Sequence, residues 1–196
     1  MICCKALMMK NIAVFASGFG SNFEAIIEAA NNGTLHANIA LLVVDKPACY
    51  AVERAHNHNI PVFAFNPKDY DSKEAYEKEI VKQLQSYQID LIALAGYMRL
   101  VGSVLLENYA HRIINIHPAL LPAFPGTHSI EKAYNHGVKV FGITIHYVDA
   151  GMDTGPIIDQ ESFKKKEGES VEEVETRIHQ LEHQLYPKVL ERILNH

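Results

Sequence analysis

The sequence predicts an α/β fold. We expect a Rossmann-like, mostly parallel twisted sheet with helices on both faces, and a C-terminal part with longer strands and a closing helix. Between residues 11 and 116, short apolar runs alternate with segments of helical apolar spacing. The first of these runs ends in a glycine loop. The last part of the chain holds two longer strand-like runs and then one long amphipathic segment.

The short apolar runs are the expected parallel strands, at residues 11–17, 38–44, 61–65, 90–95 and 112–116. The expected helices cover residues 23–31, the stretch from Pro47 to His58, and residues 72–87 with Ser72 as a possible cap. Right-handed crossovers then place the loops that follow the strands along one edge of the sheet, where α/β proteins bind ligands.

The second half of the chain has a different pattern. Residues 117–127 (HPALLPAFPGT) contain three prolines and a glycine, which excludes a regular element. A short helix through Asn135 follows. Long strands are expected at 139–148 and 155–164, with a loop between them, and the closing helix at 170–194. Ser170 and Glu173 fit a capping box at the start of that helix.

Composition narrows the class of protein. Apolar residues make up 48% of the 196 residues, enough for one full core, so we expect a single domain at 11–196 after an N-terminal extension at 1–10. The formal charge of −5 argues against sequence-independent nucleic-acid binding. No apolar run reaches the roughly 18 residues of a membrane span. Three cysteines without a C-x-x-C pair favour the reducing cytoplasm and give no support for a metal site.

The first glycine loop is a candidate phosphate site. Gly18-Phe19-Gly20-Ser21-Asn22 lies between a strand and a helix, where backbone amides and two polar side chains are available as donors. A plain tight turn is the simpler interpretation. A dinucleotide site is a further alternative, with Asp45 as its acidic residue, but Phe23 stands where that fingerprint has its third glycine. A single phosphate therefore fits better than a pyrophosphate.

Polar side chains also end a later strand. Asn115 and His117 alternate onto one face, roughly 7 Å apart, while Ile116 points to the core. A lone histidine at a strand end is usually structural. Downstream, Asp149 and Asp153 lie in a glycine-containing loop where acids are common turn formers. An acid paired with His117 would orient the ring and favour its protonated form.

These residues carry a resemblance to a known family. Asn115-Ile116-His117-Pro118-Ala119-Leu120-Leu121-Pro122, followed by Asp153-Thr154-Gly155-Pro156, resembles the signature of the 10-formyltetrahydrofolate-dependent formyltransferases. The resemblance runs from about Asn11 to Leu194. The glycine loop and the phrase Ala95-Gly96-Tyr97-Met98-Arg99 are most similar to the branch that formylates the amine of glycinamide ribonucleotide in purine (IMP) biosynthesis.

The resemblance implies the roles of individual residues. Asn115, His117 and Asp153 would be catalytic. The ribonucleotide would bind Gly20, Ser21 and Asn22 through its phosphate, and His179, Gln180, Leu181 and Glu182 at the ribose and glycinamide end. The folate would contact Lys73, Met98, Arg99, Leu100, Val101, Asn115, Asp149, Ala150, Gly151, Met152 and Asp153.

Two positions depart from the family: Ala119 replaces a frequent Ser, and Lys73 replaces an Arg found in some members.

The implied reaction is direct attack of the amine on the formyl carbon, with 10-formyltetrahydrofolate as co-substrate and no metal. Asn115 and His117 would donate to the developing oxyanion, each donor being worth on the order of 3 kcal/mol. The proton route stays open among His117, Asp153 and an ordered water. Small molecules would be the only substrates, with no nucleic acid and no membrane, and the enzyme would be a monomer or a weak homodimer.

Three rival functions differ in what they require. Methionyl-tRNA formyltransferases need a further RNA-binding domain and a basic surface. Formyltetrahydrofolate hydrolases usually carry an extra N-terminal regulatory domain, for which ten leading residues are too few. A non-catalytic nucleotide-binding module would use the glycine loop and leave Asn115, His117 and Asp153 without a joint purpose.

Overall fold

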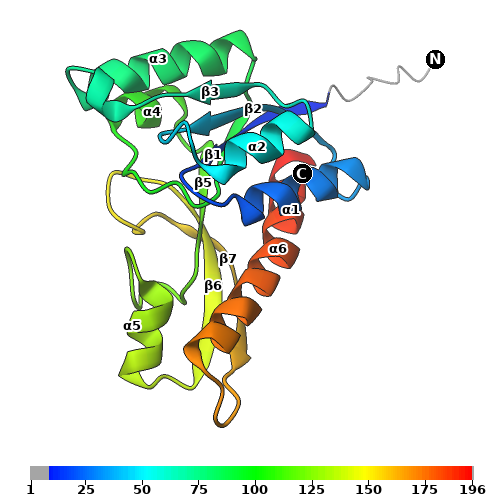
Figure 1. Ribbon diagram of the computed structural model, residues 1–196, viewed down its shortest axis with the longest axis vertical. Coiled ribbons are helices and arrows are strands. Elements are labelled where there is room, and N and C mark those ends of the chain that lie inside the picture. The colour runs from blue at the N-terminus through cyan, green and yellow to red at the C-terminus, as the bar shows by residue number, and fades with distance from the viewer. Residues whose placement is uncertain (1–8, 196) are drawn as a thin grey trace.

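A seven-stranded sheet with strand order β3-β2-β1-β4-β5-β6-β7 forms the centre of the protein, as the computed structural model shows for residues 9–195 (Figure 1). The strands are β1 (Lys10–Ala16), β2 (Ala37–Val44), β3 (Val62–Ala64), β4 (Leu91–Leu94), β5 (Ile113–His117), β6 (Val140–Tyr147) and β7 (Ile157–Lys164). Strands β1 to β5 are parallel, whereas β6 and β7 are antiparallel to their neighbours. The predicted fold class is confirmed.

Helices cover both faces of the sheet. They are α1 (Ser21–Asn31), α2 (Tyr50–Asn57), α3 (Lys73–Ser86), α4 (Ser103–Asn108), α5 (Ser129–His136) and α6 (Val171–Asn195), with a 3-10 turn η1 (Pro67–Asp69). One core layer packs α1, α2, α5 and α6 against the sheet, and the other packs α3 and α4 against the opposite face. The sequence did not predict η1 or α4, because both are too short to show a helical period.

Strand β1 shows why both faces are covered. Ile12 and Val14 belong to one core layer, while Ala13 and Phe15 belong to the other. Successive side chains of a strand point to opposite faces, so a continuous apolar run requires a helix layer on each side. The uninterrupted apolar sequence of this strand therefore determines its central place in the sheet.

The sheet has a topological switch point between β1 and β4. The chain runs outward from β1 through β2 to β3 and then returns to place β4 on the other side of β1. The loops that follow β1 and β4 therefore turn in opposite directions and leave a crevice at the carboxyl ends of the strands.

Helix α6 fastens the neighbouring strands at this edge. The buried hydroxyl of Tyr186 lies 3.0 Å from the carbonyl oxygens of both Leu94, the last residue of β4, and Ile114, near the start of β5, and shares its one proton between them. Figure 1 shows α6 running beside α1 and along β6 and β7. The strand that carries Asn115, the next residue of β5, is thus tied to the last helix.

The first strand begins earlier than the expected domain boundary. Residues 1–8 of the expected N-terminal extension lie outside the described residues, and β1 begins at Lys10, inside that expected extension. Within residues 9–195, no helix has the combination of length and apolar composition that crossing a membrane requires.

Candidate active site

A cleft of about 910 Å³ opens at the switch point, between the loops that follow β1, β4, β5 and β6. Most of the residues expected to bind or react line it: Gly20, Ser21, Asn22, Met98, Arg99, Leu100, Val101, Asn115, His117, Asp149, Gly151, Met152, Asp153, His179 and Glu182. Ala150, Gln180 and Leu181 do not line the cleft. Lys73 also lies outside it, because its side chain runs against Gly102 beside the buried Glu77.

The three residues expected to be catalytic meet in this cleft. Asp153 Oδ1 lies 3.4 Å from Asn115 Nδ2, and Asp153 Oδ2 lies 3.4 Å from His117 Nδ1. These contacts are long for hydrogen bonds. In a ligand-free active site such contacts are often long and tighten only when substrate binds.

Asp153 is held as a carboxylate. The neighbouring His146 lowers its pKa, burial opposes this, and the Gly126 N–H at 2.7 Å and the charge of His117 add to the lowering, so that the pKa is about 2. Its backbone adopts the left-handed region at φ 55°, which is uncommon for a residue with a side chain. Strained backbone of this kind concentrates at functional sites.

The proline-rich loop after β5 supplies two backbone groups to the site. His117 Nε2 donates to the carbonyl of Phe124 at 2.9 Å, while the N–H of Gly126 binds Asp153. Both ring nitrogens of His117 thus face acceptors, Phe124 O and the Asp153 carboxylate. The prolines hold the loop in the irregular path that brings these groups back to the strand end.

His146 is a site residue that the sequence reasoning missed. It pairs with Asn115 across β5 and β6, and its Nε2 lies 3.1 Å from Asn115 Nδ2 and 3.6 Å from Asp153 Oδ1. Its Nδ1 donates to the Tyr147 carbonyl at 2.8 Å. The signal in the sequence is Thr144 and His146, two polar residues on one face of an otherwise apolar strand.

The glycine loop exposes the start of α1. Gly20 has φ 75°, and no side chain caps the helix N-terminus. Among the described residues, the first intrahelical bond is that of the Glu24 N–H to the Gly20 carbonyl at 3.0 Å, and the N–H groups of Ser21 and Asn22 have no protein acceptor. Free amides and the positive end of the helix dipole favour an anion here.

A polar network joins α1 to α6 at this end of the cleft. Glu182 Oε2 accepts from Asn22 Nδ2 at 3.1 Å and from His179 Nδ1 at 2.9 Å. The hydrogen bond from His179 to Glu182 raises the pKa of His179 against the opposing effect of burial, while burial lowers the pKa of His183. The two stacked histidines thus have pKa values shifted in opposite directions.

Comparison with known proteins agrees with this geometry. Residues 10–190 match the family model described as formyl transferase. The chain belongs to the formyl transferase family.

Individual members of the family are similar over nearly the whole chain. The phosphoribosylglycinamide formyltransferase of Bacillus subtilis is 54% identical over 186 residues, covering 95% of each chain. The Escherichia coli enzyme of the same name is 34% identical over 180 residues, 92% of this chain and 85% of that one. The crystal structure of glycinamide ribonucleotide transformylase 1 from Geobacillus kaustophilus has a TM-score of 0.93 at 56% identity, covering 95% of this chain and 100% of that one.

Asp45, the acidic residue of the alternative dinucleotide site, holds the opposite wall of the cleft in place. Its buried carboxylate accepts from Ser17 Oγ at 2.5 Å and from Arg99 Nε at 2.8 Å. Ser17 Oγ in turn accepts from the Met98 N–H at 2.9 Å. Asp45 therefore fastens the loop after β4, and each of its two oxygens already accepts a hydrogen bond from the protein.

Apolar side chains surround the mouth of the cleft. Met98, Leu100 and Met152 are 66%, 47% and 58% exposed, which is high for residues of this kind. They belong neither to the core nor to a covered surface, so they fit contacts with a flat apolar ligand. Within residues 9–195, no group of three or more His, Cys, Asp or Glu side chains is arranged to hold a metal ion.

Proposed function

We propose that this protein transfers the formyl group of 10-formyltetrahydrofolate to the primary amine of glycinamide ribonucleotide, a step of purine biosynthesis. The observation that carries the proposal is the convergence of Asn115, His117 and Asp153 within one cleft. The trio lies between a free helix N-terminus, suited to a phosphate, and an apolar rim, suited to a pterin. The family and its similar members support the same reaction.

The chemistry follows from the groups around the formyl carbon. The lone pair of the amine forms a new C–N bond, and the carbonyl π electrons move to oxygen. Asn115 and His117 donate hydrogen bonds to that oxyanion. When the oxyanion collapses, the bond to the folate nitrogen breaks, and that nitrogen gains the proton that the amine loses. No covalent enzyme intermediate is required.

Asp153 acts as a fixed anion in this scheme. With a pKa of about 2, it is ionised throughout the physiological range. Its Oδ2 lies 3.4 Å from His117 Nδ1 and so orients the ring that donates to the oxyanion. The proton that the amine loses reaches the folate nitrogen through His117, Asp153 or an ordered water.

The two substrates occupy opposite walls of the cleft. The ribonucleotide phosphate lies on Gly20, Ser21 and Asn22, with His179 and Glu182 at the ribose and glycinamide end. The folate lies against the 98–101 and 149–153 segments. The enzyme works in the cytoplasm as a monomer or a weak homodimer.

The test is a spectrophotometric formyl-transfer assay with both substrates. We expect glycinamide ribonucleotide to be formylated in proportion to folate consumed. Methionyl-tRNA and water serve as alternative acceptors in parallel reactions. Ligand binding without transfer would support the nucleotide-binding module instead, and transfer to tRNA or to water would support the corresponding rival enzyme.

A further inference from the structure

The glycine loop before α1 is held from behind by helix α2. The carbonyl of Gly18 accepts from the N–H of Ala51 at 3.1 Å, and the carbonyl of Phe19 accepts from Nε of Arg54 at 3.0 Å. Two successive loop carbonyls are therefore turned toward α2. One of these bonds is a backbone contact, and the other depends on a single side chain.

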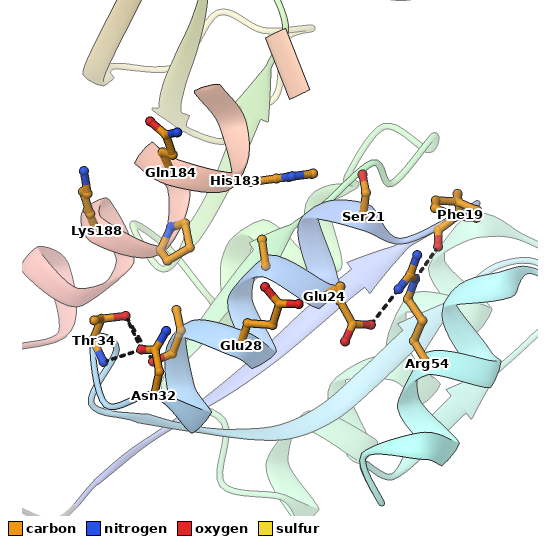
Figure 2. Close-up of a pocket in the computed structure, with 13 residues that line it drawn as sticks. Phe19, Ser21, Glu24, Glu28, Asn32, Thr34, Arg54, His183, Gln184 and Lys188 are labelled. Atoms are coloured by element: carbon orange, nitrogen blue, oxygen red, sulfur yellow. Dashed lines mark hydrogen bonds and ion pairs between the residues drawn. The ribbon is translucent and has the colours of Figure 1, made fainter. Parts of the chain in front are cut away.

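Arg54 is itself firmly placed. Its Nη1 donates to Glu24 Oε2 at 2.7 Å, and Glu24 Oε1 lies 2.7 Å from Nε2 of His58. Its guanidinium lies 4.6 Å from the ring centre of Phe19 and 5.0 Å from that of Tyr50. The side chain is only 17% exposed. Figure 2 shows Arg54 reaching between Phe19 and Glu24.

The ion pair between Arg54 and Glu24 balances the negative charge in the first turn of α1. Burial raises the pKa of Glu24, but hydrogen bonds from Arg54 and His58 outweigh this and lower it, so Glu24 is ionised. An unpaired carboxylate in the first turn of α1 would oppose an anion bound at the same helix end. Arg54 thus neutralises Glu24 and holds the Phe19 carbonyl at the same time.

Arg54 acts from outside the cleft. It lines a second, smaller cavity between α1, α2 and α6, and it is absent from the lining of the main cleft. Gly20 fits closely against α2, since a Cβ on it would lie 2.9 Å from Ala51 Cβ. Any effect of Arg54 on a ligand of the cleft is therefore transmitted through the loop.

We propose that Arg54 is a positioning residue for binding of the ribonucleotide phosphate. By fixing the Phe19 carbonyl toward α2, it keeps the following amides, those of Gly20, Ser21 and Asn22, aimed into the cleft. The inference rests on the proposed function, which places the phosphate at this loop. Arg54 does not touch the formyl group, so it affects substrate affinity and leaves the chemical step unchanged.

The first test is Arg54→Met, with steady-state kinetics for both substrates. We expect KM for glycinamide ribonucleotide to rise about tenfold, the effect of losing one charged hydrogen bond that orders a binding loop. We expect kcat and KM for the folate to stay within about twofold. An unchanged KM for the ribonucleotide, or an equal rise for both substrates, would overturn the proposal.

Two further variants separate loop geometry from charge. Arg54→Met also leaves Glu24 unpaired, so the R54M/E24Q double variant removes that charge. We expect the double variant to keep the raised KM and Glu24→Gln alone to stay near wild type. Recovery of the wild-type KM in the double variant would assign the effect to charge and contradict positioning.

Arg54→Lys tests the proposal even if R54M does not fold. We expect its KM for glycinamide ribonucleotide to lie between the values of the wild type and of R54M. A wild-type KM in Arg54→Lys would contradict the proposal.

Controls distinguish this proposal from the placement of the phosphate itself. Arg192→Met removes an exposed arginine that pairs with Asp159 at 2.8 Å and lines neither cavity, and should leave both KM values unchanged. Ser21→Ala tests the loop directly. If it raises KM for the ribonucleotide while Arg54→Met does not, the phosphate site stands and positioning by Arg54 fails. If neither variant changes that KM, the proposed phosphate site fails as well.

Discussion

Asn115 and His146 face each other across the junction where the sheet changes from parallel to antiparallel, with Asn115 Nδ2 3.1 Å from His146 Nε2. The imidazole is oriented by its own hydrogen bond to the Tyr147 carbonyl. The amide expected to donate to the oxyanion is therefore held by a ring that is itself fixed. This second contact keeps the amide plane in place while the contact to Asp153 is still long.

We accordingly expect His146→Ala to lower kcat about tenfold, because Asn115 loses the partner that orients it. KM for either substrate should change less than about threefold. His146→Gln, which keeps a polar atom near Asn115, should recover part of the rate. Full kcat in the alanine variant would show that Asn115 needs no such support.

Asp153 should also contribute to stability in a pH-dependent way. Its pKa is about 2 in the folded protein and 3.8 ordinarily, so its contribution is fully present above the ordinary value and is lost as the pH falls toward the folded value. Asp153→Asn should lower the free energy of unfolding by about 2 kcal/mol at neutral pH. Urea denaturation at several pH values measures this, with Asp71→Asn as an exposed control. A deficit that does not shrink below the ordinary pKa contradicts this role.

His179 predicts a pH dependence for ribonucleotide binding. Its hydrogen bond to Glu182 raises its pKa, so the ring stays protonated to a higher pH than an ordinary histidine and loses its charge as the pH rises further. KM for glycinamide ribonucleotide should therefore increase with pH through that range. His179→Gln should have a higher KM at low pH and a flatter profile. An identical profile for the two enzymes would exclude His179 as the titrating group.

Replacing Asp45 should weaken the binding of the folate only. Because it fastens Ser17 and Arg99 beneath the loop after β4, Asp45→Asn should raise KM for the folate about fivefold and leave KM for the ribonucleotide near wild type. Asp159→Asn, which breaks the exposed pair with Arg192, is the matched control. A rise in KM for the ribonucleotide alone would contradict a role for Asp45 on the folate side of the cleft.

The sequence predicted those parts of the protein that depend on local patterns. The apolar runs located the parallel strands because buried strands must be apolar on both faces, as β1 shows with Ile12 and Ala13 in different layers. The capping box was also correct, since Ser170 N–H donates to Glu173 and Glu173 N–H donates back to the Ser170 hydroxyl.

The remaining features depend on contacts between distant segments. His146 enters the site only through its register opposite Asn115, which the pattern of β6 alone does not determine. Asn22 reaches Glu182 across two helices far apart in the chain. The role of Asp45 was open for the same reason: an acid at a strand end suits a ribose or an arginine, and the partner Arg99 follows a different strand.

The central claim is that Asn115, His117 and Asp153 act together on one carbonyl oxygen, and His117→Ala tests it most directly. Single-turnover formyl transfer should be measured with both substrates saturating, beside the dissociation constant for glycinamide ribonucleotide. We expect most of the transfer rate to be lost, on the order of a hundredfold or more, while ribonucleotide binding stays nearly intact. A variant that transfers formyl groups at the wild-type rate would contradict the account.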